Sequence, residues 1–195
     1  MIDKIKTWIK AMRPEQWVKN IVVLAAHVFA RADPSQEHAA GISALFDILL
    51  AAVVFCLVSS SIYLFNDAHD AAADGAHPVK RKRPVAAGVI AVPAADACSI
   101  FIAVFSLVVT GLFMPAGFGA IIVAYLAMQI LYTVLLKRIP YVDVFVISCG
   151  FVLRAVAGAV ALDVRISQWL LLCTFLLSLF LALCKRRHEK VILTE

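Results

Sequence analysis

The stretch NDAHDAAAD, residues 66–74, places three carboxylates and one amide close together in a chain that is otherwise mostly apolar. At 100° per residue on a helix, Asp67, Asp70 and Asp74 lie within about 60° of one another, and Asn66 widens the arc to about 100°. Crowded carboxylates repel one another unless a cation compensates, and oxygen ligands suit a hard cation such as Mg²⁺. If the helix continues through Asp74, this spacing predicts a site for Mg²⁺ and a diphosphate.

Basic residues follow the acidic ones, since residues 80–83 read KRKR. Guanidinium and ammonium groups hold phosphate oxygens and offset the charge that builds on a leaving group. Lys80 and Arg83 are therefore candidate substrate contacts, and Tyr63 is another because it shares the helix face of Asp67. A solvated loop, kept on one side of a membrane by its positive charge, is the alternative interpretation of both charged runs.

The elements that must position these residues are membrane helices. Of the 195 residues, 63% are hydrophobic and 16% are charged, whereas about a quarter of a soluble domain is charged. Six apolar segments are each roughly long enough to cross a hydrocarbon core of about 30 Å, although the first of them is short. The sequence thus predicts an all-α, polytopic transmembrane bundle forming one domain over residues 1–195. The predicted spans are 17–30 (the shortest), 43–65, 94–113, 117–136, 141–162 and 167–184.

The basic residues predict how the bundle is oriented. Fifteen of the 18 Lys and Arg residues fall in regions that six spans place on one side, including the long loop at 66–93. By the positive-inside rule this side is cytoplasmic, and the acidic stretch lies on it. The net charge of +5 does not indicate a nucleic-acid partner, because the basic residues lie in short loops between apolar spans.

Polar residues at the ends of the other spans are further candidates for substrate binding. Asn20 stands out because an amide at a membrane entry is costly without a partner. Arg154 lies inside the fifth span, three turns after Asp143 on the same face, and is expected to contact an anion or a structural carboxylate. Flanking positive charge alone also explains the basic residues after the last span. The full set is Arg13, Lys19, Asn20, Tyr132, Lys137, Asp143, Arg154 and Lys185.

With these residues assembled, the chain resembles the UbiA superfamily of intramembrane prenyltransferases. The match is NDAHDAAAD after a span ending in SSSIYLF, followed by HPVKRKRPVAAG. Within the superfamily it is most similar to the decaprenyl-phosphate phosphoribosyltransferase branch. The closer match lies in RPEQWVKN (13–20), in LYTVLLKRIPYVDVFVISCGFVLRAVAGAVA (131–161) and in WLLLCTFLLSLFLALCKRRHE (169–189).

The resemblance implies a Mg²⁺-dependent transferase in a bacterial inner membrane, with its active site facing the cytoplasm. The donor would be phosphoribosyl diphosphate and the acceptor a polyprenyl phosphate. Asn66, Asp67, Asp70 and Asp74 would be the catalytic metal ligands. A prenyltransferase acting on an aromatic acceptor is the alternative enzyme, and a non-catalytic membrane protein is the alternative of another class.

Two departures from the family pattern matter. Most aromatic prenyltransferases of the superfamily carry a second DxxxD motif, whereas here Ile147 stands four residues after Asp143. The family fold has nine helices, and this chain is expected to supply six. A fragment, a truncated product, and a chain completed by a second copy or by a partner with the missing helices are the explanations left open.

Overall fold

The computed structural model describes residues 2–139 and 141–194, and all regular structure in them is helical, which confirms the all-α class. The helices, with η for 3-10 type, are α1 (Ile2–Met12), η1 (Pro14–Leu24), α2 (Ala25–Arg31), η2 (Pro34–Ala40), α3 (Ile42–His69), α4 (Ala71–Ala76), η3 (Lys80–Lys82), α5 (Val92–Phe113), α6 (Ala116–Val134), η4 (Leu136–Arg138), α7 (Val142–Ala161) and α8 (Gln168–Thr194).

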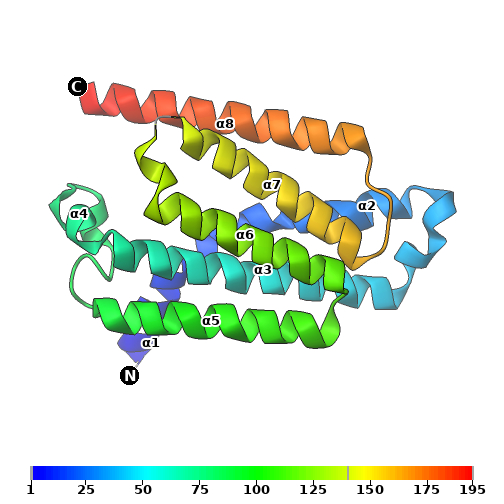
Figure 1. Cartoon of the computed structure of the whole chain (residues 1–195), viewed down its shortest axis with the longest axis horizontal. Coiled ribbons are helices and arrows are strands. Elements are labelled where there is room, and N and C mark those ends of the chain that lie inside the picture. The colour runs from blue at the N-terminus through cyan, green and yellow to red at the C-terminus, as the bar shows by residue number, and fades with distance from the viewer. Residues whose placement is uncertain (1, 140, 195) are drawn as a thin grey trace.

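Five helices are long and apolar enough to cross a membrane, namely α3, α5, α6, α7 and α8 as far as Arg187. They match five of the six predicted spans. Helices suit this environment because their backbone groups bond internally, while lipid offers no hydrogen-bonding partners. The chain is therefore a multi-pass membrane protein. In Figure 1, α1, α4 and the C-terminal end of α8 lie at one end of the bundle, and η2 lies at the other.

The predicted first span, residues 17–30, is not one α-helix. A 3-10 helix, η1, runs from Pro14 to Leu24, and the short α2 continues from it. Arg13 precedes η1 in a left-handed conformation with φ 52°. Pro14 suits the first helical position because its fixed φ matches a helix and its missing N–H would have no partner there. The β-branched residues of η1 also have weak α-helix propensity.

The core lies where α3, α6 and α7 meet. Phe55 of α3 is fully buried and packs edge-on against Phe118 and Tyr125 of α6, with ring centroids 6.0 and 5.6 Å apart. On α7, Gly158 lies directly against the backbone of η1, where a β-carbon would overlap the carbonyl oxygen of Val23. This close approach holds η1, and hence the residues around Arg13, against the bundle.

The helix that carries the acidic stretch breaks within it. α3 ends at His69, Asp70 has φ −97° and ψ 4°, and α4 then runs for six residues only. The expected continuous helix through Asp74 is therefore wrong. Even so, Asp67 and Asp74 on either side of the break stay close enough for Arg83 to contact both.

Candidate active site at the end of α3

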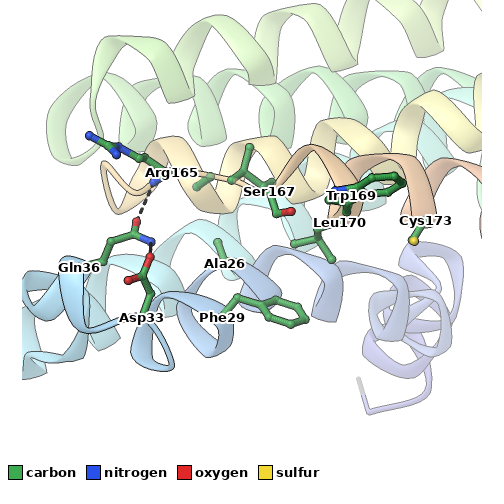
Figure 2. Close-up of a pocket in the computed structure, with 11 residues that line it drawn as sticks. Ala26, Phe29, Asp33, Gln36, Arg165, Ser167, Trp169, Leu170 and Cys173 are labelled. Carbon is green, nitrogen blue, oxygen red and sulfur yellow. Dashed lines mark hydrogen bonds between the residues drawn. The ribbon is translucent and has the colours of Figure 1, made fainter.

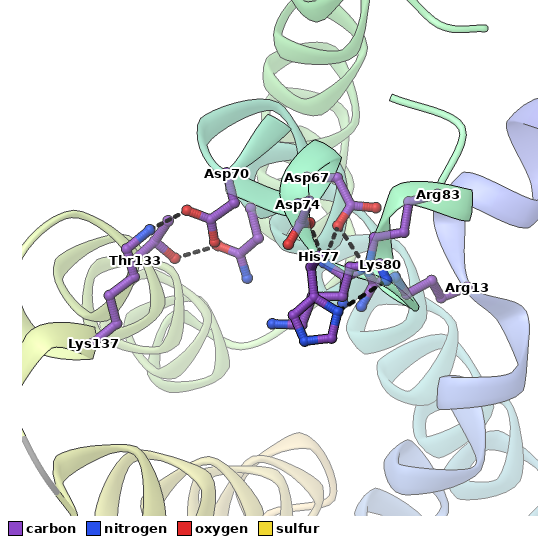
Figure 3. A network of polar contacts seen from close by, with 10 residues as sticks. Arg13, Asp67, Asp70, Asp74, His77, Lys80, Arg83, Thr133 and Lys137 are labelled. Atoms are coloured by element: carbon purple, nitrogen blue, oxygen red, sulfur yellow. Dashed lines mark hydrogen bonds and ion pairs between the residues drawn. The ribbon is translucent and has the colours of Figure 1, made fainter. Parts of the chain in front are cut away.

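The four polar side chains of the acidic stretch divide into two groups (Figure 3). Asp67 and Asp74 face the basic residues Arg13 and Arg83. Asp70 and Asn66 face the C-terminal end of α6 and η4 instead. The four side chains therefore do not converge in one small volume. Their grouping follows the helical spacing, which places Asn66 beside Asp70 and Asp67 beside Asp74.

Asp67 is the most enclosed of the three carboxylates, with 2% of its side chain exposed. Its Oδ1 accepts hydrogen bonds from the Arg13 guanidinium and from Nη1 of Arg83, the latter at 3.2 Å. Its Oδ2 is also buried and has no hydrogen-bond partner among the described residues. Since an unpartnered buried oxygen is costly, Oδ2 is poised to receive a ligand.

Arg83 joins the two carboxylates of the first group. Its Nη1 lies 2.5 Å from Oδ2 of Asp74 in addition to its contact with Asp67. Arg83 is half-buried, whereas Lys80 and Lys82 are exposed. The KRKR run is therefore more than a solvated loop, because its last residue is built into the acidic site.

Arg13 reaches Asp67 from the other side of the site, 54 residues away in the sequence. Its guanidinium also lies over the ring of Tyr63, 5.0 Å from the ring centroid. A cation placed over an aromatic face is attracted by the ring quadrupole. Arg13 and Tyr63, both predicted from the sequence, thus contact each other and position Asp67.

The second group pairs α3 with the end of α6. Lys137 forms an ion pair with Asp70, and the Thr133 hydroxyl donates to Oδ1 of Asn66. Lys137 was predicted and Thr133 was not. The available signal was a hydroxyl four residues before Lys137, near the end of an apolar helix, where a polar side chain one turn away shares a face.

Arg154 lies deeper in the bundle, 5% exposed, and its partners are neutral. It donates to Asn20 Oδ1 at 2.7 Å, to the Gly150 carbonyl at 2.8 Å and to the Tyr125 hydroxyl at 2.9 Å. Its guanidinium also lies 4.9 Å from the centroid of the Tyr125 ring. The prediction that Asn20 needs a partner is confirmed. No described carboxylate forms an ion pair with Arg154, so the expected structural carboxylate is not found among those residues.

Replacing Arg154 with lysine is expected to destabilise the protein, even though the charge is kept. A lysine cannot reach Asn20, Tyr125 and the Gly150 carbonyl together, and each buried polar group left without a partner costs about 1–3 kcal/mol. Thermal unfolding in detergent measures the loss. Arg31→Lys, at the exposed end of α2, is the matched control, and equal midpoints for the two variants would contradict the assignment.

The remaining predicted residues lie nearby but outside these two groups. Asp143, at the start of α7, pairs with Arg186 of α8 at 2.6 Å rather than with Arg154. Its other oxygen, Oδ1, is buried without a hydrogen-bond partner in the described part of the chain. Lys19 lies on η1 beside Asn20, Tyr132 precedes Thr133 on α6, and Lys185 precedes Arg186 on α8. Asp143 is thus placed by an ion pair with α8 at the same end of the bundle as the acidic site.

The residues at the end of α3 fit a hard divalent cation by chemistry, since carboxylate and amide oxygens are its preferred ligands. The unpartnered Oδ2 of Asp67 supports this fit. Yet no three Asp, Glu, His or Cys side chains within the described ranges are gathered as a ready metal cluster. A metal here would draw Asp67 and its neighbours into new positions, and the assignment of four ligands stays a prediction.

A larger cavity of about 650 Å³ lies at the opposite end of the bundle, between α2 and the start of α8 (Figure 2). Its walls are mostly apolar, from Phe29, Trp169 and Leu170 among others, and Asp33 and Gln36 stand at its rim. Hydrogen bonds from Ser35 and Gln36 lower the pKa of Asp33. This cavity shares no residue with the acidic site and is not the candidate active site, despite its size.

Comparison with known proteins connects this geometry to a family. The decaprenyl-phosphate phosphoribosyltransferase of Mycolicibacterium smegmatis is 44% identical over 93% of this chain and 56% of its own length. The protein of the same name from Corynebacterium glutamicum is 42% identical over 93% of this chain and 54% of its own. The chain therefore spans about half the length of the curated relatives it matches.

Solved structures share the fold. A UbiA homolog from Archaeoglobus fulgidus, bound to GPP and Mg²⁺, superposes with a TM-score of 0.71 at 18% identity, over 89% of this chain and 60% of that one. Residues 21–188 match the model of the UbiA prenyltransferase family. Because this match covers most of the sequence, including both groups around the end of α3, the chain belongs to the UbiA prenyltransferase family.

Proposed function

We propose that this chain transfers 5-phosphoribose from phosphoribosyl diphosphate to a polyprenyl phosphate such as decaprenyl phosphate, with Mg²⁺ as cofactor. An oxygen of the acceptor phosphate forms a bond to C1 of the ribose. The bond between C1 and the diphosphate oxygen breaks, and its electron pair leaves with the diphosphate. No general base is needed, because the acceptor phosphate is already an anion.

One observation carries this proposal: a buried carboxylate, Asp67, held between Arg13 and Arg83 with one oxygen unpartnered. Acidic groups suit a metal and basic groups suit phosphate, so their combination suits a metal diphosphate. The names of the M. smegmatis and C. glutamicum relatives support phosphoribose as the transferred group and decaprenyl phosphate as the acceptor. The incomplete second motif after Asp143 weighs against prenyl transfer to an aromatic acceptor.

Each group of residues has a role in this proposal. Asn66, Asp67, Asp70 and Asp74 would hold Mg²⁺, which when bound helps to neutralise the diphosphate. Arg83 and Lys137 already lie within ion-pair distance of these carboxylates and would contact donor phosphates. Both basic groups stabilise negative charge on the leaving diphosphate while the ribose acquires oxocarbenium character. Arg154 would position η1 through Asn20.

The site would face the cytoplasm of a bacterial plasma membrane. Support comes from the basic residues of α1, residues 80–83 and the end of α8, which lie at the same end of the bundle as the acidic site (Figure 1). At this position the site would be accessible to a water-soluble donor from the cytoplasm and to a lipid acceptor from the bilayer.

The test uses membranes that contain this chain, labelled phosphoribosyl diphosphate, polyprenyl phosphate and Mg²⁺. A labelled lipid that forms with Mg²⁺ and is lost with EDTA is expected. A parallel reaction receives a prenyl diphosphate and 4-hydroxybenzoate. Product in the second reaction alone would replace this proposal with aromatic prenyl transfer. If neither reaction forms a product, the proposal that this chain is catalytic is rejected.

A further inference from the structure

A basic pocket of about 400 Å³ adjoins the acidic site, between the α1–η1 junction and residues 79–84. Asp67 lies in its wall, so the pocket and the candidate active site are continuous. The cationic residues that line it are Lys10, Arg13, Lys80, Lys82 and Arg83.

The charge of this pocket is unbalanced. Its wall includes two carboxylates, Glu15 and Asp67, against five cations. Arg13 and Arg83 bond to carboxylates of the acidic site. The ammonium groups of the three lysines form no ion pair with any carboxylate in the described ranges, and all three side chains are exposed. Clustered cations repel each other, so this arrangement favours a multiply charged anion in the pocket.

The pocket lies on one side of the acidic stretch only. Lys137 and Asp70 lie on the far side, across the break between α3 and α4 (Figure 3). A diphosphate held by the acidic stretch, with Lys137 beside it, therefore leaves Lys10, Lys80 and Lys82 unused. A ligand that reaches both regions must carry a second anionic group, separated from its diphosphate by a polar spacer.

On the basis of the proposed function, we propose that this pocket binds the 5-phosphate of the phosphoribosyl donor and selects donors that are phosphorylated at both ends. Lys10 and Lys82, together with Lys80, would donate to the phosphate oxygens as charge-assisted hydrogen bonds. The pocket would then be unfavourable for a prenyl diphosphate, whose apolar tail would have to displace water from charged groups. Lys10 and Lys82 are thus specificity residues for the donor.

The test compares two ligands, phosphoribosyl diphosphate and inorganic diphosphate, each with Mg²⁺, binding to the full chain in a neutral detergent. The double variant Lys10→Gln/Lys82→Gln is expected to lose at least about tenfold in affinity for phosphoribosyl diphosphate. Its affinity for diphosphate should change by less than about threefold, because that ligand has no second phosphate to reach the pocket.

Two neighbouring charges serve as controls. Lys6 lies one turn before Lys10 on α1, and Arg81 lies between Lys80 and Lys82, yet neither lines the pocket. The variant Lys6→Gln/Arg81→Gln removes the same charge and should bind both ligands as the unmodified chain does. Equal losses in the two double variants, or equal losses for the two ligands, would overturn the assignment.

A lipid headgroup offers the same phosphate chemistry from another source. Vesicles of phosphatidylcholine, with and without phosphatidylglycerol, separate the sources. If the variant binds phosphoribosyl diphosphate normally but its activity no longer responds to phosphatidylglycerol, the pocket serves lipid and the inference is wrong. If neither labelled ligand binds the unmodified chain with Mg²⁺, the proposed function fails as well. Diphosphate binding without preference for the ribosyl compound rejects this inference alone.

Discussion

Asp67→Asn is expected to reduce phosphoribosyl transfer by at least about a hundredfold, a typical loss when one electrostatic contact at a reacting group is removed. Asparagine keeps the size of the side chain, so the change removes charge from a site that is buried and shared by two arginines. Arg13 and Arg83 would then face an amide in place of a carboxylate, and the oxygen poised for a metal would lose its charge. Rate measurements in membranes containing equal amounts of inserted protein test this expectation.

The matched control for this variant is on the same helix. Asp47 lies near the other end of α3 and is exposed, so Asp47→Asn removes the same charge far from the site. It should retain full activity. Wild-type turnover by Asp67→Asn would remove Asp67 from the catalytic assignment, whereas a similar loss in both variants would point to a general charge effect.

Gly158→Ala is expected to lower the stability of the protein, although it adds only a methyl group. The new β-carbon would overlap the carbonyl oxygen of Val23 and lie 3.0 Å from the carbonyl carbon. Backbone atoms cannot rotate away as a flexible side chain can, so η1 and α7 must separate. Overpacking of this kind costs about 1–3 kcal/mol. The midpoint of thermal unfolding in detergent should fall, and the contact between Arg154 and Asn20 should weaken.

Gly111 provides the control because nothing lies within 4 Å of a β-carbon built there. Gly111→Ala, in α5, should leave stability unchanged or raise it by up to about 1 kcal/mol, since alanine favours a helix more than glycine does. If Gly158→Ala unfolds at the same temperature as Gly111→Ala, the close packing of η1 against α7 is not a source of stability.

Much of the fold could be predicted from the sequence because hydropathy reports the length of an apolar helix directly. The spans that became α3, α5, α6, α7 and α8 were recognisable for this reason. The acidic stretch was also recognisable, since residue types and spacing are local properties. Tyr63 was placed on the face of Asp67 correctly, and its contact with Arg13 follows from that placement.

The pairing between helices could not be predicted in the same way. Thr133 and Asn66 are 67 residues apart in the sequence. Whether their side chains come into contact depends on how α3 packs against α6. The pairing of Asp143 with Arg186, rather than with Arg154, depends likewise on the packing of α8 against α7. The break at Asp70 was missed because alanine-rich sequence around it favours a continuous helix, and tertiary contacts of the carboxylates override this weak preference.

The 3-10 winding of η1 sets how far this segment extends along the bundle. A 3-10 helix rises about 2.0 Å per residue and an α-helix about 1.5 Å, so the 11 residues of η1 extend about 5 Å farther than an α-helix of equal length would. With three residues per turn, Trp17, Asn20 and Val23 form one straight row, which meets Ser60, Arg154 and Gly158 in turn. Rewinding this stretch as an α-helix would shorten the segment, move the row away from its partners and draw Arg13 away from Asp67. The 3-10 winding thus sets both which residues of η1 meet α3 and α7 and where Arg13 lies relative to Asp67.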